Sequence, residues 1–321
     1  MKKYVPIVMV IIAVLVLAAC QSKYMTTARL AIRDEKDPDK AIENLKMEIQ
    51  QNPKNADAYL FMSQIYGQYK QDYYASYQYA KKAVEIDPAK KKDVDLIYLT
   101  TWSQLHNQGL EALKEDNFKE ALIKLNQAHD IQPDSLITFE LIGDTYIRAD
   151  SINKALDVFI QIYNKHPENI DAINKIATIN YNNGNYEDAV EYFLILHNLE
   201  PENTDWLYNI WVTEIKLGNE DAALGYAKQA IEIDPTNTEL LYNIADMNFN
   251  QKKYAEAAEY YEKIVEIDPT QLEALKYLCY CLSNTKNYAD LVTYSQKWLD
   301  VQPESKEAQQ FLNLAKQMLN K

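Results

Sequence analysis

Glycine is scarce in this chain of 321 residues, which has six glycines against 25 tyrosines. Loops that hold phosphate groups need closely spaced glycines, and tight β-hairpins need glycine at their turns. The shortage therefore argues against a nucleotide-binding loop and against a fold rich in hairpins. Hydrophobic residues make up 47% of the chain and charged residues 25%, which fits a well-packed body.

Basic residues are also in short supply, since 33 Lys and Arg face 47 Asp and Glu, for a formal net charge of −14 at pH 7. A surface of this sign repels phosphate backbones, so we expect no nucleic-acid partner. The excess of acid has two interpretations. It can serve solubility alone, or it can attract a basic partner.

Residues that carry chemistry are few. Beyond Cys20, the cysteines are Cys279 and Cys281, whose side chains would diverge by about 200° on a helix, so a bridge between them is sterically poor. The four histidines lie far from this pair in the sequence. We therefore expect buried cysteines and no metal site. The chain has no Ser-His-Asp order, His-Glu-x-x-His motif or phosphate loop, so we also expect no catalytic residue, no cofactor and no small-molecule substrate.

The first twenty residues, MKKYVPIVMVIIAVLVLAAC, join a basic pair to an apolar run and end in Leu-Ala-Ala-Cys. A run of about 15 apolar residues is short for a bilayer span and typical of a signal peptide. The last four residues resemble the lipobox of bacterial lipoproteins, in which the cysteine is acylated. This resemblance implies a signal peptide over residues 1–19, a lipid on Cys20 and a very short tether at 20–21. The alternative is an uncleaved anchor in the inner membrane with an incidental cysteine.

Gln21 follows the cysteine, where an Asp would suggest retention at the inner membrane. By resemblance to Gram-negative lipoproteins, we expect the outer membrane, with the protein facing the periplasm. Acylation by more than one chain would hold the protein firmly, because a single acyl chain gives only marginal binding.

Prolines punctuate the rest of the chain at a fixed interval. From Pro133 to Pro303 they recur every 34 residues, and a small residue stands twelve positions before most of them. Residues 184–203 and 252–271 closely resemble the tetratricopeptide repeat (TPR), whose period is 34 residues. The resemblance implies an all-α fold, an α-solenoid in which antiparallel helix pairs form a right-handed superhelix. It covers about eight repeats over residues 22–303, and residues 304–321 are expected to form a C-terminal capping helix, with Phe311, Leu312, Ala315 and Leu319 on one side.

Two local features of the repeat have physical causes. Small residues such as Gly109 and Gly143 in the first helix of a repeat would let a neighbouring helix approach closely. The second helix ends at proline, because proline disfavours helical geometry in the residue before it. The tetrapeptide Glu-Ile-Asp-Pro at 85–88, 232–235 and 266–269 is such an ending, with its Ile expected to face the stack.

One interval, from Pro88 to Pro133, is 45 residues, which is 11 longer than the period. Eleven residues are about three helical turns. We therefore expect the first helix of the third repeat to be extended near residues 89–101 without rotation of its buried face. The added stripe of Val94, Ile97 and Tyr98 has two interpretations: it packs on the second repeat, or it forms a docking or dimerisation edge.

The resemblance also implies a concave groove lined by the first helices, where a protein or an extended peptide would bind. An Asn at the sixth repeat position, as at 107, 209 and 243, can bond both groups of a peptide bond. Tyrosines would add rigid contact area. The predicted groove residues are Phe61, Tyr69, Asn107, Asn174, Lys175, Tyr181, Tyr208, Asn209, Tyr242, Asn243, Phe249, Tyr277 and Tyr280.

The sequence thus predicts a lipid-anchored periplasmic scaffold that binds a protein or peptide and performs no chemistry, with assembly of the bacterial cell envelope as its candidate role. The alternatives are the same repeats as a regulatory subunit on an uncleaved inner-membrane anchor, and an enzyme with an unrecognised site. The basic and amide residues of a carboxylate clamp are not found over three repeats, so a free C-terminal carboxylate is not the expected ligand.

Overall fold

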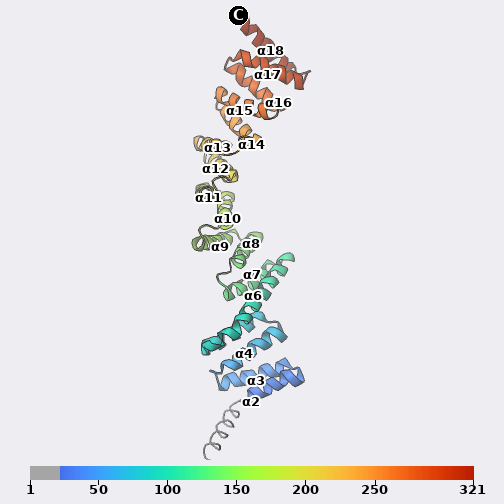
Figure 1. Cartoon of the computed structure of the whole chain (residues 1–321), viewed down its shortest axis with the longest axis vertical. Coiled ribbons are helices and arrows are strands. Elements are labelled where there is room, and N and C mark those ends of the chain that lie inside the picture. Colours follow the sequence, from blue (N-terminus) through green and yellow to red (C-terminus); the bar gives the residue numbers. More distant parts are fainter. Residues whose placement is uncertain (1–21) are drawn as a thin grey trace, which may run out of the picture. The chain divides into compact units, whose positions relative to one another are not determined.

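The structure is a computed structural model that describes residues 22–321, so the predicted signal peptide, Cys20 and Gln21 lie outside the described residues. Residues 22–321 form α-helices, with short π-helical and 3₁₀ turns and no strand, and successive helices pack as antiparallel pairs (Figure 1). This confirms the predicted all-α solenoid of helix pairs. Within the same range, no helix has both the length and the apolar character that a membrane crossing requires.

The elements are α2 (Lys23–Leu30), η1 (Ala31–Glu35), α3 (Pro38–Gln51), α4 (Ala56–Ile65), η2 (Tyr66–Lys70), α5 (Tyr73–Ile86), η3 (Pro88–Lys90), α6 (Lys91–Lys114), α7 (Phe118–Ile131), α8 (Leu136–Arg148), α9 (Ile152–Lys165), α10 (Ile170–Asn182), α11 (Tyr186–Leu199), α12 (Thr204–Leu217), α13 (Glu220–Ile233), α14 (Thr238–Asn250), α15 (Tyr254–Ile267), α16 (Leu272–Asn284), α17 (Tyr288–Val301) and α18 (Lys306–Leu319).

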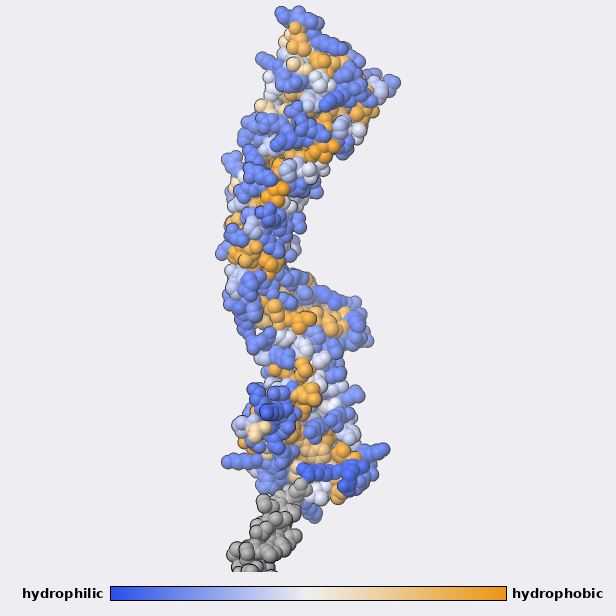
Figure 2. Space-filling model, viewed as in Figure 1, coloured by the Kyte–Doolittle hydropathy of each residue, from blue (hydrophilic) through white to orange (hydrophobic). Residues whose placement is uncertain are grey.

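The chain divides into two compact units, one ending at Ile162 and the other beginning at Tyr163. We call their described parts unit 1 (residues 22–162) and unit 2 (residues 163–321). The two differ in charge, because unit 1 has 18 basic and 22 acidic residues and unit 2 has 13 and 25. On the face of the molecule shown in Figure 2, hydrophilic residues predominate and hydrophobic residues form separate patches among them.

The turn between the two helices of each pair has a similar backbone conformation. A residue one or two positions after each first helix has a positive φ of 53° to 80°. Such a conformation costs little for glycine and about 1 kcal/mol or more for other residues. From position 116 onward these residues are 34 apart, and they are Lys36, Gln71, Asp116, Asp150, Gly184, Gly218, Lys252 and Lys286.

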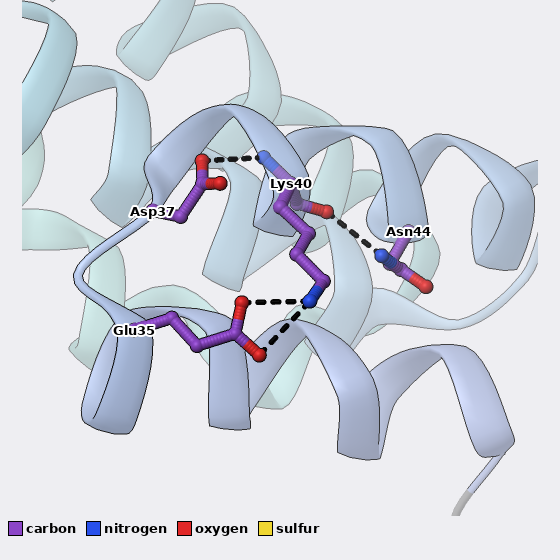
Figure 3. A network of polar contacts seen from close by, with 4 residues as sticks. All are labelled: Glu35, Asp37, Lys40 and Asn44. Carbon is purple, nitrogen blue, oxygen red and sulfur yellow. Dashed lines mark hydrogen bonds and ion pairs between the residues drawn. The ribbon is translucent and has the colours of Figure 1, made fainter.

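A polar side chain caps several of the second helices, among them α3, α5, α7 and α17. In the first pair, the carboxylate of Asp37 accepts a hydrogen bond from the backbone N–H of Lys40 at 2.9 Å, and Pro38 occupies the first helical turn (Figure 3). The Lys40 ammonium also donates to both oxygens of Glu35, at 2.7 and 2.9 Å. These groups are exposed, so the ion pair adds little stability, whereas the cap satisfies an orphan donor of α3.

Ser22, the first described residue, is hydrogen-bonded to a buried acid of α3. Glu48, which is buried, accepts hydrogen bonds from the Ser22 hydroxyl, from Asn52 Nδ2 at 3.0 Å and from Asn55 Nδ2 at 2.7 Å. Burial alone would raise the pKa of this carboxyl, but the three hydrogen bonds outweigh burial and lower the pKa below its ordinary value. Ser22 also caps α2, so the start of unit 1 is tied to α3.

Glycines mark the closest approaches between paired helices, as expected. A Cβ added at Gly109 would lie 2.6 Å from Leu125 Cγ, and one at Gly143 would lie 2.7 Å from Phe159 Cζ. Neither separation is tolerable for carbon atoms without a shift of the neighbour. Both glycines therefore set the distance between the helices of their own pair.

The Glu-Ile-Asp-Pro endings differ from the prediction in one respect. The isoleucines do not face the stack in unit 2, because Ile233 is 37% exposed and Ile267 is 44% exposed. The aspartates instead build the turn. Asp234 accepts from Thr236 N at 3.0 Å and Asp268 from Thr270 N at 2.9 Å, so the acid closes the loop that follows each helix.

Helix α6 is the longest element of the described chain, with 24 residues against 13 in α8 and α10. Of the two interpretations of its added stripe, the structure shows packing on the second pair. Val94 is fully buried, and the Tyr98 ring meets Tyr77 of α5 edge-on at 5.2 Å. The exposed apolar residues of α6 are others, Leu96 at 67% and Leu99 at 51%.

Helix α18 covers the last pair of unit 2. Ala308, Leu312 and Ala315 are buried and Phe311 is half-buried. The sequence predicts Leu319 on this buried side as well, but Leu319 is 55% exposed.

Candidate functional site

The first helices of unit 2 bring three of the predicted groove residues to one cavity. Tyr181 of α10 and Tyr208 and Asn209 of α12 line a cavity of about 330 Å³, with Thr178 and Val212 beside them. No charged side chain lines this cavity, which we call the Asn209 pocket. Phe193 of α11 contributes an aromatic side chain, so the pocket combines apolar surface with the amides of Asn182 and Asn209.

The amide of Asn209 differs from the amides buried within these helices. Asn180 donates to the carbonyl of Ile176 at 3.1 Å and Asn248 to that of Ile244 at 2.8 Å, so both are used inside their own helix. Within residues 22–321 the side chains of Asn209 and Asn243 make no hydrogen bond. Both are half-buried and stand 34 residues apart on successive first helices. Each keeps a donor and an acceptor for another molecule.

A second cavity of about 330 Å³ adjoins the first through Tyr208, which lines both. Asp205 of α12 and Glu239 of α14 supply its acids, and we call it the Glu239 pocket. The Tyr208 hydroxyl donates to Glu239 at 3.4 Å. Burial, and then the charge of Glu239, raises the pKa of Tyr208, so it remains a neutral donor. Neither Asp205 nor Glu239 forms an ion pair within the described part of the chain.

The other predicted aromatic residues of unit 2 pack against rings of their own pair or of a neighbouring pair. Tyr242 meets Tyr261 at 6.3 Å and Phe249 meets Tyr277 at 5.3 Å, measured between ring centroids. Tyr280 meets Phe311 of α18 at 5.0 Å and donates its hydroxyl to Glu307. These rings are half-buried in contacts between helices, so they offer edges to a partner rather than whole faces.

The two remaining predicted residues of unit 2 lie on α10 and are half-buried. Asn174 accepts a hydrogen bond from the Thr178 hydroxyl at 3.3 Å, which occupies one of its acceptor positions. Lys175 follows it in the sequence. Neither residue lines the Asn209 pocket.

Unit 1 holds the other predicted residues, and the structure does not gather them at one cavity. Phe61 packs against the hydrophobic core of the first pairs, Tyr69 of η2 is 48% exposed, and Asn107 of α6 is exposed. A cavity of about 420 Å³ does lie between η2, α5 and α6. Ile97 belongs to the added stripe for which a docking edge is one interpretation, whereas the other lining residues, among them Gln64, Gln68, Tyr73 and Gln104, were not predicted as a site.

A buried polar cluster joins α6 to α8 in unit 1. Thr138 Oγ1 accepts from Trp102 Nε1 at 3.2 Å and lies 3.1 Å from His106 Nδ1 and 3.1 Å from Ser135 Oγ. Burial lowers the pKa of His106. This cluster could not be predicted from the sequence, because its members are up to 36 residues apart and belong to different repeats.

The described residues show no arrangement suited to metal binding, since no group of three His, Cys, Asp or Glu residues in 22–321 could hold a metal ion. Cys279 and Cys281 are free and buried, and burial raises the pKa of each thiol to about 12. Both are thus poor nucleophiles.

Comparison with known proteins agrees with this architecture. Family models of the tetratricopeptide repeat match residues 56–90 and 238–271. No curated protein matches the chain. Similar solved structures include YrrB, described as a TPR protein with an unusual peptide-binding site (18% identity, 58% of this chain and 96% of that chain covered, TM-score 0.43).

For two further solved structures, the match covers nearly the whole of the solved chain. They are MamA from Desulfovibrio magneticus RS-1 (16% identity, 53% of this chain and 96% of that chain, TM-score 0.44) and PilF from Pseudomonas aeruginosa (17% identity, 67% and 97%, TM-score 0.41). The two matched repeats lie in unit 1 and unit 2, and each coincides with one helix pair, α4–α5 and α14–α15. The chain thus contains tetratricopeptide repeats.

Proposed function

We propose that the protein is a lipid-anchored scaffold of the bacterial cell envelope that binds an extended segment of a protein partner along the first helices of unit 2. Tetratricopeptide repeats are protein-binding scaffolds and generally not enzymes, which sets the class of function. The observation that supports the position of the site is the pair of unused amides, Asn209 and Asn243, on successive first helices.

The physical basis is the geometry of an extended chain. A peptide in this conformation presents an N–H and a C=O at every residue, and an amide side chain can pair with both. The Asn209 pocket then takes a side chain of the partner between Tyr181 and Tyr208. Rigid tyrosines lose little conformational entropy on binding, so they suit such a contact.

The test is an affinity capture from envelope membranes with the tagged full-length chain, compared with the variant Asn209→Ala/Asn243→Ala. We expect the captured partner to be lost in the variant. A matched control is Asn126→Ala/Asn313→Ala, which removes two exposed amides, one from α7 and one from α18. Unchanged capture by the groove variant would place the partner elsewhere.

The anchor is part of the proposal and is supported by the lipobox-like residues 17–20. We propose acylation of Cys20 and residence at the outer membrane, facing the periplasm. Mass spectrometry of the mature N-terminus tests this, with an acylated Cys20 expected. An intact Met1 would instead support the uncleaved inner-membrane anchor.

A further inference from the structure

We propose that the segment bound in unit 2 carries an apolar side chain and, within two positions of it, a lysine or arginine. The apolar side chain enters the Asn209 pocket, and the cationic side chain enters the Glu239 pocket. This inference rests on the proposed function and adds the chemistry of the partner.

The first step is the adjacency of the two cavities. Tyr208 lines both, and each has a volume of about 330 Å³, which is room for one side chain. Alternate residues of an extended chain point to the same side, about 7 Å apart. Two side chains on one face of an extended peptide therefore match two cavities that share a single tyrosine.

The second step is the contrast between their linings. The Asn209 pocket has no charged residue, and it includes the apolar surface of Phe193 and Val212. The Glu239 pocket contains two carboxylates and no basic residue. Burying an apolar group in the first and pairing a cation in the second are both favourable, whereas the reverse would bury an unpaired charge.

The third step is that the carboxylates of the Glu239 pocket are not already neutralised. In the cavity at the last pair of unit 2, lysines 276 and 306 line the wall beside Glu273 and Glu307, and Lys276 lies 4.0 Å from Glu307. Asp205 and Glu239 have no such cation among the described residues. Unit 2 as a whole carries 13 basic and 25 acidic residues, which adds long-range attraction for a basic segment.

Acids in the first turn of a helix also stabilise that helix through its dipole, so the experiment must separate this effect from binding. Asp205 and Glu239 stand in the first turns of α12 and α14. Asp221 and Glu256 stand in the first turns of α13 and α15, which are second helices of their pairs. Asp221→Asn/Glu256→Gln is thus a matched control for Asp205→Asn/Glu239→Gln, with the same change of charge and the same local position.

The purified full-length chain is used to select binders from a random dodecapeptide phage library. Peptides that bind are then measured by fluorescence anisotropy against the wild type, both double variants and Asn209→Ala. We expect selected peptides to be enriched in lysine or arginine within two positions of an apolar residue. Asp205→Asn/Glu239→Gln should weaken their binding at least tenfold, the control double variant less than twofold, and added salt should weaken it progressively.

Two results would overturn the inference while leaving the proposed function intact. One is a set of peptides that depend on Asn209 but show no enrichment in basic residues. The other is equal weakening by the two double variants, which would mean general attraction to an acidic surface. If no selected peptide depends on Asn209, the proposed function and the inference both fail.

Discussion

Units 1 and 2 are built from the same helix pair but differ in the contacts between successive first helices. In unit 2 the ring of Phe249 meets that of Tyr277, and the ring of Tyr280 meets that of Phe311, along an uninterrupted 34-residue period. In unit 1 the period is interrupted, and the hydroxyl of Thr138 joins α8 to Trp102 and His106 of α6. Apolar contacts tolerate small shifts, whereas a buried polar cluster is costly when one member is lost. Unit 2 should therefore depend on side-chain volume and unit 1 on hydrogen bonding.

The largest expected effect is in unit 2. Tyr261 is fully buried and its ring stacks on Tyr277 with 5.6 Å between centroids. Tyr261→Ala should cost about 3–5 kcal/mol of local unfolding free energy. Hydrogen exchange measured by mass spectrometry should show faster exchange in α14 to α16. Tyr261→Phe, which keeps the ring, should have a much smaller effect, and equal effects would contradict packing as the cause.

The corresponding change in unit 1 is Thr138→Val. It keeps the side-chain volume but leaves Trp102 Nε1 and His106 Nδ1 without their partner, at a cost of about 1–3 kcal/mol. Urea unfolding followed by hydrogen exchange in α6 and α8 measures it. Thr213→Val in unit 2 is the control, because its hydroxyl bonds only to the carbonyl of Asn209 in its own helix, at 2.6 Å. A similar cost for both would remove the distinction between the units.

Two substitutions of glycine by alanine should have opposite effects on stability. Gly143→Ala in unit 1 places a Cβ 2.7 Å from Phe159 Cζ and should destabilise by about 1–3 kcal/mol. Gly225→Ala in unit 2 meets no atom within 4 Å and should stabilise α13 by about 0.5–1 kcal/mol. Thermal and urea unfolding of the two variants should move in opposite directions. Stabilisation by Gly143→Ala would mean that α8 and α9 are not in close contact.

Acidic pH should weaken unit 1 through His106. Burial holds the folded pKa of this imidazole below its ordinary value of 6.5, so the unfolded chain binds more protons. The stability that neutral His106 supports is complete above pH 6.5 and is lost as pH falls from 6.5 towards the folded pKa. Exchange in α6 and α8 should accelerate over that range, and His106→Leu should abolish the acceleration. The same pH response in the variant would assign it to another group.

The smallest effect concerns the turns. Lys252 and Asp150 adopt φ values of 60° and 54°, where glycine is preferred. Lys252→Gly and Asp150→Gly should each stabilise by about 0.5 kcal/mol, the relief of strain minus the added entropy of the unfolded chain. Gly184→Ala should do the reverse. Calorimetric midpoints that shift by similar amounts in both units would show that the turns, unlike the first helices, are equivalent.

Much of this architecture could be predicted from local sequence. Proline spacing located the helix ends, and the small residues Gly109 and Gly143 located the close approaches. The length of α6 followed from whole helical turns. These features depend on residues within one repeat, where the 34-residue period makes the comparison direct.

Features that depend on contacts between repeats could not be predicted in this way. The period places Asn209 and Asn243 at the same repeat position, yet Asn209 lines the Asn209 pocket and Asn243 does not. Ile233 and Ile267 were expected inside the stack, but the turn formed by the following aspartate leaves them exposed. An available signal was overlooked: acids recur every 34 residues at Asp171, Asp205, Glu239, Glu273 and Glu307.

The hydrogen bond between Ser22 and the buried carboxylate of Glu48 has a mechanical consequence. Ser22 stands two residues after Cys20, and two residues of chain span at most about 7 Å. A lipid on Cys20 would therefore be joined to the fold by almost no flexible tether. The first helix pair of unit 1 would then lie at the lipid headgroups, and its rotation relative to the membrane would be restricted. Replacing Glu48 would release α2 and so lengthen the flexible tether. The orientation of unit 1 at the membrane would become less restricted, although no residue of the groove had changed.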